Sequence, residues 1–198
     1  MPRTGLTSEE LRARATDVAL DRIRLVGFDK VRLSDVAKDI GVSHAALYAH
    51  FADKSALLDA VTERWLAHVE ATGAAVAAGQ GEPERRIVEW LVTLYQLERQ
   101  RALTDPEPHR AFDLAAALSK PFVRSHLDSL IGQLTVLFSE SRKLAGEPTQ
   151  NAKLIYSATA AFHHPTLISQ SAQHDREAEL RQIVAVMLSG MASSPRER

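Results

Sequence analysis

The sequence of 198 residues contains no cysteine, so it can form neither a disulfide bond nor a thiolate metal site. It also lacks long apolar runs, because none approaches the roughly 18 consecutive apolar residues that a membrane-spanning helix needs. The first residues, MPRTGLTSEEL, contain no hydrophobic signal core. We therefore expect a cytoplasmic protein that does not associate with a membrane.

A strong excess of charge is missing as well. The chain carries 24 Lys and Arg residues against 25 Asp and Glu residues, for a formal net charge of −1. Basic and acidic residues balance even within residues 1–60. This balance counts mildly against nucleic-acid binding, although affinity for DNA depends on the charge of one face and not on net charge.

Signals for β-structure are also absent, since no segment shows a convincing alternation of period two or an Asn-Gly turn. Apolar residues recur instead at helical spacing. The capping-box pattern Thr7-Ser8-Glu9-Glu10 places the start of the first helix near Ser8. The sequence predicts an all-α protein with about nine helices, over residues 8–26, 34–40, 44–51, 53–79, 87–104, 109–118 and 121–145, an eighth that carries the apolar residues from Leu154 to Ile168 and that Pro165 kinks, and a ninth from about 175.

The stretch from Leu33 to Phe51 indicates two short helices joined by a tight turn. Gly41 can end the first helix in the left-handed conformation, and the Ser43 hydroxyl can cap the second. Ala37 lies four residues before this glycine, where a small side chain lets two helices cross closely, and Leu47 lies six residues after it. These offsets are the packing requirements of a helix-turn-helix, whose second helix enters the major groove of DNA.

Polar side chains on the outer face of this hairpin favour DNA binding. Helical hairpins also occur in proteins that do not bind DNA, and packing does not explain His44, Tyr48 and His50, nor Lys54 just beyond them. All four can donate hydrogen bonds to phosphate oxygens.

A continuous segment from about Leu11 to Ala60 resembles the amino-terminal domain of the TetR family of bacterial transcriptional regulators. The remainder matches that family only in being helical. The resemblance implies a helix-turn-helix DNA-binding domain over residues 1–54 and a helical ligand-binding and dimerisation domain over residues 55–198. The matching residues are Gly27-Phe28, Asp35-Val36-Ala37, Gly41-Val42-Ser43, Leu47-Tyr48, His50-Phe51, Asp53-Lys54 and Leu57-Leu58.

The resemblance also implies the roles of individual residues. Phosphate contacts fall on Tyr48, His50 and Lys54, and the positions that face base edges are His44, Ala45, Ala46 and Ala49. Three alanines depart from the common pattern and can offer only methyl contacts, for example to thymine. Arg32 is a second departure, because the family often has a capping threonine there. The candidate DNA-binding residues are Arg32, Ser43, His44, Ala45, Ala46, Tyr48, Ala49, His50 and Lys54.

One short recognition helix contacts too few base pairs for useful specificity, whereas a twofold pair reads an inverted repeat. We therefore expect a homodimer, and the resemblance places its interface on the last two helices. The alternative is that the same apolar residues face their own core. The candidate interface residues are Ala158, Ala161, Ile183, Val184 and Met187.

The resemblance further implies a cavity among the fourth to eighth helices that binds a small-molecule effector, expected to be largely apolar or weakly polar. Aromatic residues at helical spacing are more often ordinary core residues. The candidate wall residues are Trp65, Trp90, Tyr95, His109, Phe112, Phe122, Tyr156, Phe162 and His163.

Catalytic and cofactor motifs are not found. Adjacent histidines such as His163 and His164 point about 100° apart on a helix and cannot chelate one ion. The sequence has no glycine-rich phosphate loop, G-x-S-x-G elbow or HExxH motif, so we expect no enzyme, no cofactor and no metal. The predicted function is a ligand-responsive repressor, and the alternative is a helical ligand-binding or scaffolding protein that no longer reads DNA.

Overall fold

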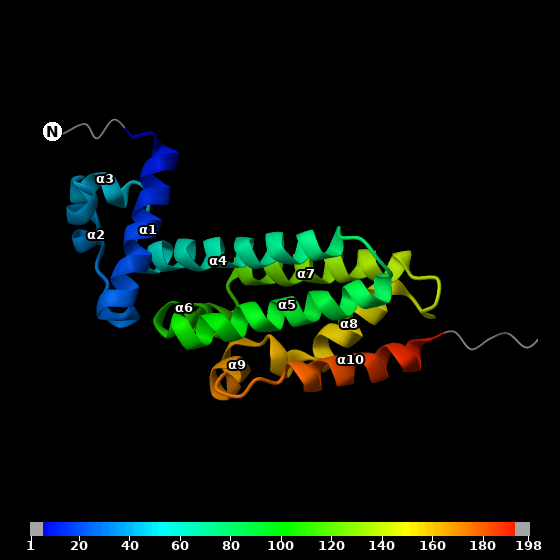
Figure 1. The fold of residues 1–198 in the computed structure, drawn as a ribbon. Coiled ribbons are helices and arrows are strands. Elements are labelled where there is room, and N and C mark those ends of the chain that lie inside the picture. The colour runs from blue at the N-terminus through cyan, green and yellow to red at the C-terminus, as the bar shows by residue number, and fades with distance from the viewer. Residues whose placement is uncertain (1–5, 193–198) are drawn as a thin grey trace, which may run out of the picture. The chain divides into compact units, whose positions relative to one another are not determined.

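The computed structural model describes residues 6–192, and these residues form helices without a β-strand (Figure 1). The predicted all-α class is confirmed. The elements are α1 (Ser8–Val26), η1 (Phe28–Lys30), α2 (Leu33–Ile40), α3 (His44–Tyr48), α4 (Lys54–Ala77), α5 (Pro83–Thr104), α6 (Pro106–Ala117), α7 (Pro121–Glu140), α8 (Pro148–Ala158), η2 (Ala160–Phe162), α9 (Pro165–Ser171) and α10 (Glu177–Met191), where η denotes a 3₁₀ turn.

The first helix begins as its sequence predicts. The Thr7 hydroxyl accepts a hydrogen bond from the Glu10 amide at 3.2 Å, and the Glu10 carboxylate accepts one from the Thr7 amide at 2.7 Å. This reciprocal capping box satisfies two amides that have no partner within the helix. The same bond from the Thr7 amide lowers the pKa of Glu10.

The predicted single eighth helix with a kink at Pro165 is wrong. The chain forms α8, the short turn η2 and a separate helix α9, which begins at Pro165. Proline has no amide hydrogen and clashes with the preceding turn, so it breaks a helix in its interior and fits well at a first helical position. Pro165 is therefore a start signal and not a kink.

The chain divides into two compact units that are not continuous in sequence. The first unit contains residues 1–66 and 105–120, and the second contains residues 67–104 and 121–198. This division differs from a single boundary after residue 54, because α6 belongs to the first unit together with α1, α2 and α3. The functional division of the chain at residue 54 stays a prediction.

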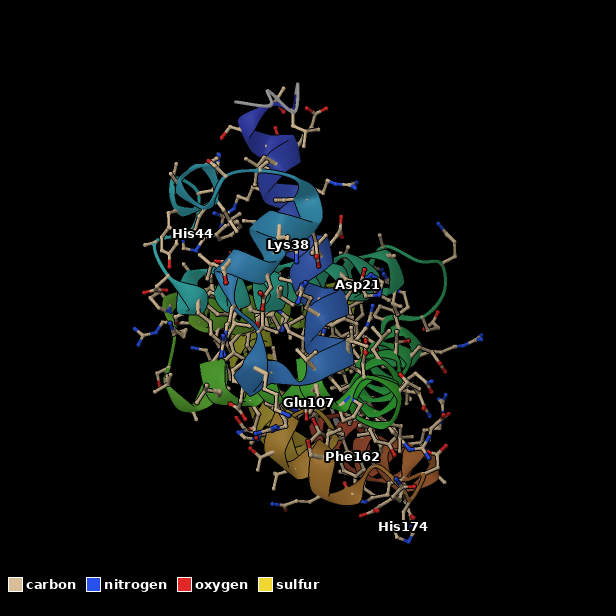
Figure 2. All side chains as sticks on the ribbon, turned by 90° about the vertical axis from the view of Figure 1, so that its left-hand side faces the viewer. Asp21, Lys38, His44, Glu107, Phe162 and His174 are labelled. Carbon is tan, nitrogen blue, oxygen red and sulfur yellow. The ribbon has the colours of Figure 1, made fainter. Side chains whose placement is uncertain are left out.

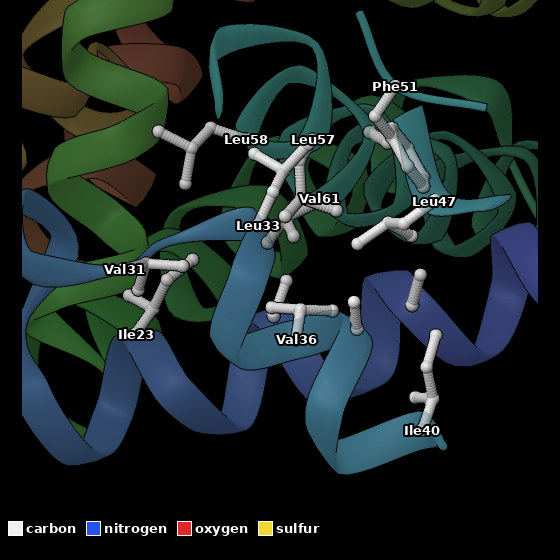
Figure 3. Packing of buried hydrophobic residues seen from close by; sticks show 14 of the residues in the cluster. Ile23, Val31, Leu33, Val36, Ile40, Leu47, Phe51, Leu57, Leu58 and Val61 are labelled. Atoms are coloured by element: carbon white, nitrogen blue, oxygen red, sulfur yellow. The ribbon is translucent and has the colours of Figure 1, made fainter. Parts of the chain in front are cut away.

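The core of the first unit joins α1, α2, α3 and the beginning of α4 (Figure 3). Fully buried side chains in this cluster include Ile23, Val36, Leu47, Phe51 and Leu57. Burying a side chain of this size contributes about 1.5–3 kcal/mol. The hairpin of α2 and α3 is thus fixed to its unit by its apolar face, which leaves the opposite face free.

The second unit has its own core, in which a polar bridge crosses three helices. The Trp90 indole donates to the Gln133 side-chain oxygen at 2.9 Å, and the Gln133 amide donates to the Glu70 carbonyl at 3.0 Å. A Cβ atom at Gly73 would lie 2.6 Å from that Gln133 oxygen and 2.9 Å from the Trp90 nitrogen. Glycine at position 73 therefore allows α4, α5 and α7 to approach closely.

Candidate nucleic-acid interface

The turn between α2 and α3 has the geometry that its sequence predicts. Gly41 adopts φ 75° and ψ 29°, and its amide bonds the last carbonyls of α2. The Ser43 hydroxyl accepts a hydrogen bond from the Ala46 amide at 3.1 Å and caps α3. A left-handed residue followed by a serine cap turns the chain sharply, so that α3 crosses α2 and exposes its outer face.

The second helix is shorter than its prediction, because α3 has five residues and ends at Tyr48. On its exposed face the His44 and Tyr48 rings meet edge to face, with centroids 4.5 Å apart. Figure 2 shows the His44 side chain on α3 and that of Lys38 on the neighbouring α2, and both residues are exposed. Ala45 and Ala49 are exposed beside this pair, and Ala46 is half-buried. The surface thus presents one imidazole, one phenol and methyl groups.

His50 lies where α3 gives way to the loop before α4, and residues of α1 hold it there. Its Nδ1 atom is 3.4 Å from the Ser8 hydroxyl, and its carbonyl accepts a hydrogen bond from the Arg12 guanidinium at 3.2 Å. That guanidinium also lies 4.8 Å from the centroid of the Phe51 ring. Sequence reasoning did not single out Arg12, since helical periodicity shows only that it is exposed.

Lys54 begins α4 and is tethered to the turn that follows α1. Its ammonium donates to the Asp29 carbonyl at 2.6 Å and lies 5.7 Å from the centroid of the Phe28 ring. The Asp53 carboxylate caps α4 through the Ala56 amide at 2.8 Å. The lysine thus stands at a helix amino terminus, where amides and a positive charge together favour an anion.

Arg32 occupies the position before α2, and its side chain makes no capping bond there. The residue is exposed. The cap of α2 therefore lacks a side-chain acceptor, as expected where arginine stands in place of threonine. The Arg32 guanidinium remains available to a phosphate.

Several acidic residues among the first sixty form ion pairs, either with basic residues of the same segment or with basic residues further along the chain. Arg22 forms two bonds to Asp39, at 2.6 and 2.8 Å, which raise the pKa of the arginine and lower that of the aspartate. Arg64 pairs with Asp17, and Lys120 pairs with Asp59 at 2.9 Å. Within residues 6–192, no carboxylate pairs with the cations of the hairpin side, which are Arg12, Arg32, Lys38 and Lys54. Asp17 and Asp39 are thus paired with arginines that lie outside α3.

The candidate effector residues fall in both units, with Trp65, His109 and Phe112 in the first and the other six in the second. Trp90 is buried in the core. The Tyr95 hydroxyl accepts the Arg176 amide at 2.7 Å, and its ring meets Phe162 edge to face. Phe122 is half-buried on α7. A small groove of about 40 Å³, partly open to solvent, lies in the first unit, but none of the candidate residues lines it.

Tyr156 and His163 form a stacked pair in the second unit, with ring centroids 3.9 Å apart. The His163 Nε2 atom is 2.8 Å from the Tyr156 carbonyl, so this nitrogen donates and carries the proton of the neutral ring. Burial lowers the pKa of His163 to about 4 and raises that of the Tyr156 phenol. Both rings are therefore uncharged at neutral pH.

The candidate interface residues differ in exposure. Val184 is fully buried, which favours the alternative that this residue faces its own core. Ala158 is exposed, and Ala161, Ile183 and Met187 are half-buried. The large exposed apolar residues on the same helices are Leu154 on α8 and Val186 on α10. Periodicity alone could not divide the inner face from the outer face.

Among the described residues, no group of three or more His, Asp or Glu side chains could hold a metal ion. No helix in that part of the chain is both long enough and apolar enough to cross a membrane.

Comparison with known proteins adds two family matches. Residues 15–61 match the model described as bacterial regulatory proteins, tetR family, and residues 83–184 match the model described as Tetracyclin repressor-like, C-terminal domain. No curated protein sequence matches the chain.

Solved structures share the fold at low sequence identity. A TetR-family transcriptional regulator from Pectobacterium atrosepticum has a TM-score of 0.71 at 23% identity, over 96% of this chain and 100% of that one. The Thermus thermophilus repressor FadR in complex with lauroyl-CoA has a TM-score of 0.65 at 16% identity, over 94% of this chain and 98% of that one. RolR with its ligand resorcinol has a TM-score of 0.63 at 18% identity, over 92% of this chain and 88% of that one.

Proposed function

Because the chain belongs to the TetR family of bacterial transcriptional regulators, we propose that it is a cytoplasmic repressor that binds an inverted-repeat operator as a homodimer and releases it on binding a small molecule. The observation that carries this proposal is the outer face of α3. The His44–Tyr48 ring pair is exposed there without a packing role, and Asp39 on the neighbouring α2 is paired with Arg22.

The residues of this face divide between positioning and reading. Tyr48, His50 and Lys54 bind phosphate oxygens, which fixes the register of the protein on the duplex without reading sequence. Arg32 adds a further cation, and Ser43 holds α3 in place through its cap. Ala45, Ala46 and Ala49 contact thymine methyl groups, so His44 and the shape of the DNA supply most of the discrimination.

Dimerisation uses the outer faces of α8 and α10. Ala158, Ile183 and Met187 take part, together with Ala161 of the adjoining turn η2, and the exposed Leu154 and Val186 extend this surface. Exposed leucine and valine side chains on two helices favour a partner that covers them, and twofold symmetry would bring the same residues of both subunits together.

The effector is a largely apolar small molecule. Among the similar structures, RolR is in complex with resorcinol and FadR with lauroyl-CoA, so proteins of this fold bind quite different ligands. In this chain the uncharged Tyr156–His163 pair would suit a neutral group better than an ion. Trp65, Tyr95, His109, Phe112, Phe122 and Phe162 remain candidates for its wall.

Selection of bound sequences from a random duplex pool tests the function. An enriched inverted repeat with half-sites about 34 Å apart, or a multiple of that distance, supports a sequence-specific dimer. A pool that stays unenriched at low salt overturns the proposal. It would favour the alternative, a helical ligand-binding or scaffolding protein that does not read DNA, which the three alanines of α3 support.

A further inference from the structure

The turn between α1 and α2 is held by the first turn of α6. The Phe28 amide donates to a Glu107 carboxylate oxygen at 2.8 Å. Gly27 precedes it with φ 85°, and a Cβ atom at that glycine would lie 3.3 Å from the same oxygen. This contact lies within the first unit, and Figure 2 shows Glu107. The glycine leaves room for the carboxylate to reach the amide.

Two arginines reinforce this contact. Arg110 lies 3.2 Å from Glu107 and 3.5 Å from Asp29, so one guanidinium joins α6 to the turn. Arg24, in the last turn of α1, forms a two-bond pair with Asp105, just before α6. The bond from the Phe28 amide lowers the pKa of Glu107, which keeps the carboxylate ionised. The turn is therefore fixed at the Phe28 amide, at the Asp29 side chain and at α1, the helix that leads into it.

The same turn holds Lys54. Its backbone offers the Asp29 carbonyl to the ammonium at 2.6 Å, and its Phe28 ring lies below that charge. A lysine ammonium has three donors, so this carbonyl occupies one and two remain for a phosphate. A free lysine side chain loses considerable rotamer entropy when it is immobilised, and a lysine already held in place loses less on binding.

We propose that Glu107 is a positioning residue for DNA binding, which holds the Phe28–Asp29 turn so that its carbonyl presents Lys54 to the phosphate backbone. Glu107 touches no DNA in this account and acts only through Lys54. The proposal rests on the proposed DNA-binding function. It implies that a shift of the first turn of α6 changes affinity for DNA without a change at α3.

A double-mutant cycle tests this proposal with the full chain and a duplex of mixed sequence. Glu107→Ala should weaken binding about two- to tenfold, the loss expected when one long side chain is no longer pre-ordered. Lys54→Ala should weaken binding and reduce the salt slope by about one. In the Lys54→Ala background, Glu107→Ala should have almost no further effect.

Three further variants separate positioning from general destabilisation. Glu107→Gln keeps an oxygen that can accept the Phe28 amide, so its affinity should stay near that of the wild type. Glu147→Ala is the matched control, because that carboxylate also accepts two backbone amides, of Thr149 and Gln150, but in the second unit. The exchange of the Lys54 ammonium protons, followed by NMR, should quicken in Glu107→Ala and stay unchanged in the control.

The outcomes distinguish this proposal from the function on which it rests. If Lys54→Ala weakens binding and Glu107→Ala does not, the positioning role is refuted while DNA binding stands. If Glu107→Ala costs the same factor in both backgrounds, its effect does not pass through Lys54 and the proposal fails. If the wild type does not bind the duplex at low salt, the proposed function fails first.

Discussion

The edge-to-face contact of His44 and Tyr48 limits what each ring can do on DNA. The imidazole lies against the phenol with centroids 4.5 Å apart, which fixes the direction in which its nitrogens point. An aromatic contact of this kind contributes about 0.5–1.5 kcal/mol, enough to favour one orientation before binding. An imidazole fixed in this way should discriminate between bases and should not only add nonspecific affinity for DNA.

His44→Ala should therefore relax base preference at one or two operator positions, by about 1–3 kcal/mol at most. Tyr48→Phe keeps the ring that supports the imidazole but removes a phosphate donor, so it should weaken all sequences alike. Sequence selection with both variants and the wild type checks this difference. Identical selected sites for His44→Ala and the wild type would exclude His44 as a reader.

The half-buried His163 makes stability depend on pH. Its pKa of about 4 in the folded chain lies below the ordinary value of 6.5, so the unfolded state binds more protons between these two values. The free energy of unfolding should then fall as the pH is lowered from about 6.5 to 4. His163→Gln should flatten this part of the profile in denaturant titrations. His174→Gln, at an exposed residue of the same unit, should leave it unchanged.

Residue chemistry predicted the turn between α2 and α3 well, because backbone rules decide its outcome. Gly41 and Ser43 act as the turn requires, because few residues can adopt a left-handed conformation or cap a helix. The contacts of Lys54 with Asp29 and of Phe28 with Glu107 could not be predicted. They join residues far apart in sequence, and only the packing of α4 and α6 against the turn after α1 brings them together.

At the scale of single elements, the end of α6 holds a strained residue. Ser119 has φ 51°, and the Lys120 amide reaches back to the Ala115 carbonyl at 3.1 Å, as in a helix end that normally uses glycine. A non-glycine residue in the left-handed region costs roughly 1–2 kcal/mol.

Ser119→Gly should raise the free energy of unfolding by about 1 kcal/mol, since glycine takes this conformation without strain. A protein of this size should then melt about 2–4 °C higher. Ser125→Gly is the matched control, because Ser125 is exposed within α7, where glycine should destabilise. A rise in melting temperature in both variants would contradict the strain at Ser119.

The bounds of a helix were predictable where a single strong sequence signal, such as a capping motif, determined them. The capping box predicted the first residue of α1 correctly, at Ser8. The segment of α8, η2 and α9 misled the prediction, because its apolar residues keep helical spacing across two breaks. Spacing records which residues are buried and says little about whether the backbone between them remains continuous.

At the scale of the whole molecule, the proposed dimer places the exposed Leu154 and Val186 against a second subunit. Leu154→Asp or Val186→Asp should raise the dimer dissociation constant by about tenfold or more, since a charge would be buried without a partner. Sedimentation velocity at several concentrations measures this change. Leu167→Asp replaces a residue exposed to a similar degree on α9 and should leave the dimer intact. Equal weakening by all three variants would argue against an interface on α8 and α10.

The membership of α6 in the first unit has a consequence for the order in which the protein is made. Residues 1–66 leave the ribosome early, but residues 105–120 complete the same unit only after all of α5 has been synthesised. At about 5–20 residues per second, this interval lasts seconds, far longer than a helix needs to form. During that time the Phe28 amide has no Glu107 carboxylate to which it can donate. The nascent helix-turn-helix therefore emerges without its tether, and the finished DNA-binding unit appears only when most of the chain exists.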